Sequence, residues 1–186
     1  MRAAIAVVLL TGTLFFVFGC GQSTSPTVPT SVPSVAPSVM SSSLAVLAVS
    51  KNQVPLKGTM QGTDSDSDPT STSIVVTTDG TGIGTHLGQF SFTQRVTVFF
   101  ATGTSAGSAH WVAANGDSIE TTIAGSGHPT PTPGVLSITD VHTITGGTGR
   151  FAGAQGSFTV ERLASVVTFL TSGSFDGTIS SPGAAH

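Results

Sequence analysis

From residue 51 onward the sequence repeats one pattern, in which β-branched residues and phenylalanine alternate with serine, threonine and glycine. No window in this part of the chain spaces apolar residues at i, i+3, i+4 and i+7, as an amphipathic helix would. Strict alternation is typical of a strand with one buried face. The pattern therefore predicts an all-β protein in which helices are nearly absent.

Turn-forming residues divide this alternating region into short segments. Asn115-Gly116 is the strongest hairpin signal, because both residue types tolerate a positive φ, and Asp79-Gly80 predicts a second turn. The expected strands cover residues 54–62, 72–78, 83–88, 90–100, 107–114, 118–126, 135–145, 155–163 and 173–180, with 164–170 as a possible further strand.

The number and order of these segments favour one closed sheet. Short strands that follow one another through tight turns suit a single antiparallel up-and-down β-barrel of about eight strands, because closure removes the exposed sheet edges. A two-sheet β-sandwich is the alternative. Apolar faces are evident within single segments. One side of the strand at 90–100 carries Phe90, Phe92, Val96, Val98 and Phe100, with Gln94 among them.

A glycine-rich stretch, TITGGTGRFAGAQGSF at residues 143–158, must reverse the chain between two expected strands. Its glycines can supply a positive φ or a close approach of two backbones. We expect Phe151 to plug one end of the barrel and Arg150 to point to solvent. The structural turn residues are Gly146, Gly147, Gly149, Phe151 and Gly153.

Residues 146–154, GGTGRFAGA, resemble the "GGTG, any residue, Phe" signature of allene oxide cyclases and dirigent proteins. The resemblance implies an eight-stranded, calycin-like barrel over most of residues 50–183, and a homo-oligomer, since relatives of this barrel are often trimers. It also raises an isomerase or cyclase activity as an alternative function. The motif itself is a structural turn in that superfamily, so it bears on fold more than on chemistry. The polar cavity residues of the plant cyclase have no recognisable counterpart in this chain.

The first twenty residues are typical of an export signal. Arg2 precedes an almost wholly apolar run that ends at Phe18, and Gly19-Cys20 follows. This resembles the bacterial lipoprotein signal, in which cleavage before the cysteine is followed by lipid attachment, here to Cys20; a free thiol after an ordinary secretory signal is the alternative. We expect a signal peptide at 1–19, a Ser/Thr/Pro-rich tether at 20–45 and a barrel domain at 46–183.

The predicted location is the cell envelope, with the lipid holding the chain at the outer membrane or cell surface. Gly21 stands where an aspartate would indicate retention at an inner membrane. The expected folded part carries five basic and nine acidic residues without a basic cluster. Nucleic acid is therefore not an expected partner, because binding phosphates requires a positive surface.

Asp140 and His142 are the candidate catalytic residues. They lie two apart in an expected strand, so both share a face with apolar neighbours. A carboxylate can orient and charge an imidazole, and such a pair could act as acid and base if the face lines the interior. Otherwise the two residues form a polar spot on the surface or at a subunit contact.

Other motifs have simpler explanations. Residues 103–107 match G-x-S-x-G, but the sequence after them alternates like a strand instead of forming the required helix. Residues 147–152 match G-x-G-x-x-A without a following helix or βαβ unit. Asp64, Asp66 and Asp68 lack the glycine and glutamate of an EF-hand and predict a solvated acidic turn. His110 and Glu120 are expected to pair across the Asn115-Gly116 hairpin.

No metal ligand set with short His or Cys spacing is present, and no cofactor is implied. The sequence therefore predicts a lipid-anchored barrel that binds a small apolar ligand or acts as a scaffold. An isomerase or cyclase and a purely structural surface protein remain as alternatives.

Overall fold

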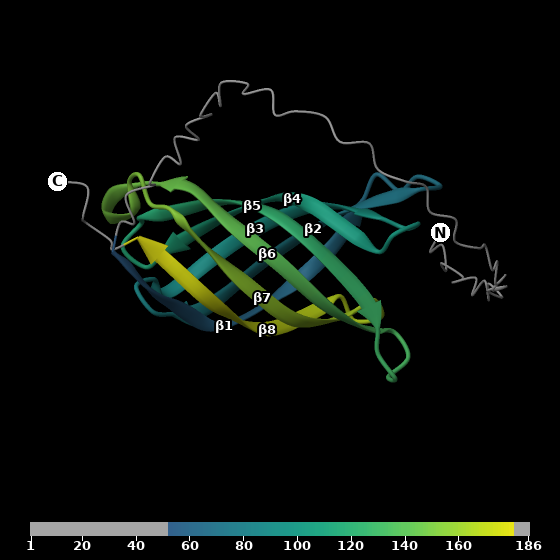
Figure 1. Cartoon of the computed structure of the whole chain (residues 1–186). Helices are drawn as coiled ribbons and strands as arrows, with labels where there is room; N and C mark the ends of the chain where they lie inside the picture. The colour runs from purple at the N-terminus through teal and green to yellow at the C-terminus, as the bar shows by residue number, and fades with distance from the viewer. Residues whose placement is uncertain (1–51, 181–186) are drawn as a thin grey trace, which may run out of the picture. The chain divides into compact units, whose positions relative to one another are not determined.

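The computed structural model describes residues 52–180, which form eight antiparallel strands and one short 3-10 helix. Figure 1 shows the strands wound around a single axis. The elements are β1 (Gln53–Ser67), β2 (Ser73–Gly84), β3 (Gly88–Phe99), β4 (Thr104–Ala113), β5 (Ser118–Pro129), β6 (Val135–Gly147), η1 (Gly149–Phe151), β7 (Gly156–Ser165) and β8 (Leu170–Ser180).

Each strand pairs with its sequence neighbours, and β1 pairs with β8 to close the barrel. The closing pair runs in register from Gln53 opposite Ser180 to Thr63 opposite Leu170. The alternation therefore predicted the correct class, a closed eight-stranded up-and-down barrel rather than a sandwich. Among the described residues, no helix is long and apolar enough to span a membrane.

Aromatic side chains form a core inside the barrel. Trp111 stacks on Phe92 with ring centroids 5.0 Å apart and meets Phe158 and Phe175 edge-on at 5.3 and 5.6 Å. Phe90 lies against the same indole at 5.2 Å. All five rings are buried. Because aromatic side chains bury large apolar areas and favour tilted or edge-to-face contacts, this cluster accounts for much of the packing.

The two ends of the barrel differ. The η1 end carries η1, the start of β1, the end of β8, and the β2–β3 and β4–β5 turns. Phe151 is fully buried there, while the Arg150 guanidinium covers its ring at 4.9 Å and lies 3.6 Å from Asp117. We call the opposite end the loop end, because the β1–β2, β3–β4, β5–β6 and β7–β8 connections all lie on it.

Some expected boundaries were wrong. Asp79-Gly80 is no turn, since β2 continues through it, and an added Cβ at Gly80 would come within 2.5 Å of the Phe92 ring. This glycine makes room for an interior side chain and does not reverse the chain. Asp64 and Asp66 belong to β1, so only Asp68 of the expected acidic turn lies in the β1–β2 connection, with φ of 52°. Most of segment 164–170 is the β7–β8 turn.

Candidate functional site

Asp140 and His142 both face the barrel interior from β6, and both are 0% exposed. They do not bond to each other in the described part of the chain. The Asp140 carboxylate accepts hydrogen bonds from Arg162 Nε at 3.1 Å and from Ser105 Oγ at 3.4 Å. His142 Nδ1 lies 3.0 Å from Thr121 Oγ1. Each member of the candidate pair is therefore held by other partners.

Arg162 is the centre of a buried polar network. Its Nη1 donates to Thr171 Oγ1 at 3.1 Å and lies 3.7 Å from an Asp64 carboxylate oxygen. Asp64 in turn accepts a hydrogen bond of 2.7 Å from Thr78 Oγ1. One guanidinium thus lies between two carboxylates, inside the barrel and toward its loop end. Buried charges need such pairing, because an isolated ion loses its hydration without compensation.

The sequence analysis missed Arg162 and Asp64 as site residues. A signal was present for Arg162, because alternation along β7 places it on the same face as Phe158, Val160 and Ala164, which are buried. A charge on an apolar face indicates a partner within the fold. The partner itself could not be found this way, because Asp64 is remote in the sequence and reaches Arg162 only through barrel closure.

His142 lies in an apolar environment. Its ring stacks on Phe158, with centroids 4.8 Å apart and planes inclined by 12°, and meets Trp111 edge-on at 5.5 Å. Burial, and secondarily the positive charge of Arg162, lowers the pKa of His142 to about 3. The imidazole is therefore neutral at neutral pH, and its pKa is far from the value that suits a general base there.

Three buried nitrogen atoms have no hydrogen-bond partner within the described residues. They are Gln94 Nε2, Trp111 Nε1 and His142 Nε2. Buried polar groups in native proteins are nearly always hydrogen-bonded, so each of these atoms is a candidate contact for a small bound molecule. Two of them belong to rings in contact, because Trp111 meets His142 edge-on.

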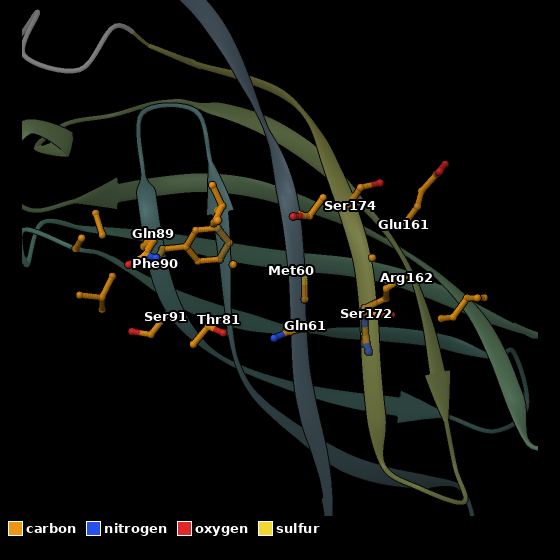
Figure 2. A pocket seen from close by; sticks show the side chains of 18 of the residues that line it. Met60, Gln61, Thr81, Gln89, Phe90, Ser91, Glu161, Arg162, Ser172 and Ser174 are labelled. Carbon is orange, nitrogen blue, oxygen red and sulfur yellow. The ribbon is translucent and has the colours of Figure 1, made fainter.

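A hollow of about 1330 Å³ lies on the outer wall, and Figure 2 shows side chains that line it. Its polar lining consists of outward-facing, exposed side chains. Met60, Phe90 and Arg162 also border the hollow, but they are buried and face inward. Paired positions such as Gln61–Ser172 and Thr81–Ser91 form rows across neighbouring strands. None of these four polar side chains bonds to another described residue. The hollow is therefore an open, hydroxyl- and amide-rich surface, separate from the buried Asp140 and His142.

Exposed apolar side chains gather on two connections of the loop end. One group lies on β3–β4 and the other on β7–β8, on opposite sides of the barrel end. Isolated exposed apolar residues are common, but a grouping of this size on one end indicates an interaction surface. We call it the apolar rim, and it consists of Phe99, Phe100, Val166, Val167, Phe169 and Leu170.

The glycine-rich turn uses its residues differently. Gly149 and Gly153 have φ of 54° and 66°, and an added Cβ at Gly147 would collide with the Ser118 carbonyl. Gly146 has open space around it and no positive φ.

Two other sequence motifs have structural explanations. Residues 104–107 continue as strand β4 with no helix after them, and His110 Nδ1 pairs with Glu120 across the hairpin.

Between residues 52 and 180, no group of three or more His, Cys, Asp and Glu side chains could hold a metal ion. Cys20, the predicted lipid site, lies outside the described residues.

The comparisons with known proteins give one structural likeness. No protein-family model matches the chain, and no curated protein matches it. A solved structure of a pterocarpan synthase dirigent protein is similar, with 16% sequence identity, a TM-score of 0.48, and coverage of 77% of this chain and 98% of that chain. The barrel topology given above rests on the chain's own strand pairing.

Proposed function

We propose that the chain is an exported scaffold module, anchored to the cell envelope by lipid on Cys20, whose barrel catalyses no reaction. One observation carries the proposal: Asp140 is bonded to Arg162 and Ser105, and His142 to Thr121, so the two groups best suited to acid–base chemistry are bonded to other residues and not to each other. A catalytic base needs hydrogen-bond reach to its reacting partner and a suitable pKa. His142 has neither a carboxylate partner nor such a pKa.

The aromatic core supports the same function. Five buried rings and the His142 imidazole pack together inside the barrel, and the centroids of contacting rings are 4.8 to 6.2 Å apart. Packing of this kind stabilises a shape, and it leaves recognition to the outer wall and the ends. A cyclase or isomerase would instead need a substrate space bordered by its acid and base.

A second function is favoured by a specific observation. Gln94 Nε2, Trp111 Nε1 and His142 Nε2 have no partners within the described chain, and all three are buried in the interior. A small molecule with hydrogen-bonding atoms could satisfy them. In this alternative the barrel binds a small ligand, and the polar network around Arg162 fixes the surrounding side chains.

Intact-protein mass spectrometry of the full chain, expressed in a bacterium and extracted from its membranes, tests both functions. Under denaturing conditions we expect a chain that begins at Cys20 and carries acyl groups. Under native conditions the scaffold function predicts no additional bound mass. A reproducible small-molecule mass that His142→Phe abolishes would replace the scaffold with the ligand-binding function. A soluble chain that retains residues 1–19, or that lacks acyl groups, would overturn the lipid anchor.

A further inference from the structure

We propose that the apolar rim docks onto the surface of a lipid bilayer composed of uncharged lipids. The inference uses the proposed function only for the location of the protein next to a membrane. The rim itself is a separate surface, so it can be tested on a chain that carries no lipid.

The exposure of the rim is the first argument. Val167 is 73% exposed and Leu170 is 59% exposed, and aromatic side chains accompany them on both connections. The apolar side chains lie on two connections and on the strand ends beside them, on opposite sides of the barrel end, rather than in one flat central patch. Loop tips of this kind can enter the soft interfacial layer of a bilayer together, whereas a protein partner is usually bound by an apolar centre with a polar border.

The backbone of the β7–β8 connection is already hydrogen-bonded within the protein. Val166 N donates to Gly134 O at 3.0 Å, and Phe169 N donates to Ser165 O at 2.8 Å. The intervening amides of Val167 and Thr168 both donate to Ser165 Oγ, at 3.3 and 3.1 Å. A loop that leaves water must satisfy its backbone groups internally. The amide groups of this connection therefore meet one requirement for leaving water.

The β3–β4 connection shows part of the same pattern. Phe100 N donates to Thr72 O, and Gly103 N donates to Phe99 O, each at 2.9 Å. Neither connection contains a charged residue, from position 99 to 104 or from 165 to 171. Entry of the rim into the interfacial layer would thus require no ion on these loops to lose its water.

The surrounding charges select the type of lipid. Asp66 and Asp68 lie at the loop end, and between residues 52 and 180 only Asp68 of the two has a nearby cation, Arg95 at 3.5 Å. No lysine is present among residues 58–180. Anionic lipid headgroups would therefore repel this end, in contrast to proteins that bind membranes through basic patches. We expect the rim to prefer zwitterionic phosphatidylcholine over phosphatidylglycerol.

The chain outside the described residues is long enough to permit this orientation. The tether leads into β1 at the η1 end, opposite the rim. A strand of 12 residues tilted in a barrel extends on the order of 30 Å along the axis. The 32 residues from 20 to 51 could extend to roughly 100 Å at about 3 Å per residue. A lipid at Cys20 and the rim can therefore contact the same membrane.

Vesicle co-sedimentation of a chain that starts at residue 20 and carries Cys20→Ser tests the proposal. All barrel pairings lie between residues 53 and 180, so this chain keeps the complete fold. We expect it to sediment with phosphatidylcholine vesicles. The double variant Val167→Ser/Leu170→Ser should lower the partition coefficient by about tenfold or more, because two apolar side chains no longer enter the bilayer.

The matched control is Ile83→Ser/Val141→Ser, which removes two apolar side chains that are 62% and 44% exposed on the barrel wall. It should leave vesicle binding unchanged, and circular dichroism should show that both double variants remain folded. Absence of binding by the parent chain, an equal loss in the wall control, or stronger binding to phosphatidylglycerol would overturn the proposal. So would a rim-dependent dimer in native mass spectrometry without vesicle binding. None of these outcomes depends on whether Cys20 carries lipid.

Discussion

Arg162 shows how one buried residue can set the role of its neighbours. It bonds Asp140 from the side away from His142, since Arg162 pairs with Ile138 in the sheet, and its positive charge helps to lower the pKa of the imidazole. Asp140 and His142, which the sequence singled out as a pair, therefore have different hydrogen-bond partners. At the scale of single residues, the interior polar groups stabilise the fold, and their removal should lower the free energy of unfolding.

The buried ion pair gives the first prediction. Asp140→Asn should lower the free energy of unfolding by about 3–5 kcal/mol, because Arg162 would lose its nearest charged partner inside the barrel. Urea denaturation measures this change. The exposed pair Lys57–Asp176, whose atoms lie 2.8 Å apart, offers a matched control. Asp176→Asn should cost less than about 1 kcal/mol. Equal effects of the two substitutions would contradict the structural role of the network.

The second prediction concerns pH. The unfolded chain binds a proton at His142 with a pKa near 6.5, and the folded protein does so only near about 3. Between these values the unfolded state holds more protons, so the free energy of unfolding should fall as the pH decreases from about 6.5 toward about 3. The contribution of this residue is about 1.4 kcal/mol per pH unit.

Comparison of the parent chain with His142→Phe isolates this contribution, since carboxylates elsewhere titrate in both proteins. Burial, and then Asp64, raises the pKa of Asp66, which acts in the opposite direction and is also common to both. Urea denaturation at pH 6.5, 5 and 4 should show a shallower loss of stability for the variant. Parallel pH profiles would show that the imidazole is solvated in the folded protein.

At the scale of elements, the turn between β6 and β7 supplies the third prediction. Gly149 has φ of 54°, and an added Cβ would overlap the Asp117 carboxylate, so Gly149→Ala should destabilise the protein by about 1–3 kcal/mol. Gly146 in the same motif has no such constraint, and Gly146→Ala should change stability by less than about 0.5 kcal/mol. Thermal denaturation of the two variants measures the difference. A larger effect at Gly146 would contradict the constraint assigned to Gly149.

The sequence predicted the elements well where local pattern and tertiary packing agree. The Asn115-Gly116 hairpin is present, with φ of 87° at Gly116, and the alternation correctly assigned the inward face of β3. It was wrong for Phe100, which lies after the end of β3 and is exposed. It failed at Asp79-Gly80, where turn chemistry is overridden by the space that the Phe92 ring needs. Local propensity cannot reveal such a requirement, because the ring belongs to another strand.

The candidate site was predictable only in part, for a similar reason. Alternation correctly placed Asp140 and His142 on one face, together with apolar residues. It could not show that Asp140 bonds to Arg162 instead of His142, because that contact depends on the register of β6 against β7. The apolar rim was missed because segment 164–170 was considered a possible strand, and exposed apolar residues in a turn resemble a strand in sequence.

At the scale of the whole molecule, closure of the barrel gives the fourth prediction. The described ends of the chain are neighbours, since Gln53 pairs with Ser180. A circular permutant that joins these ends with a short linker and opens the chain in the exposed β5–β6 connection should fold to the same barrel. Far-ultraviolet circular dichroism and a thermal transition within a few degrees of the parent would confirm it. A permutant without a cooperative transition would show that the order of strand pairing matters for folding.

The placement of Trp111 has a practical consequence. It is the only tryptophan of the chain, tyrosine is absent, and its indole is almost fully enclosed by the side chains of the core. Nearly all intrinsic fluorescence must therefore come from one emitter, which water reaches only when the strands separate. The protein contains its own optical reporter of barrel opening, and the emission maximum should move to longer wavelength in a single step as the chain unfolds.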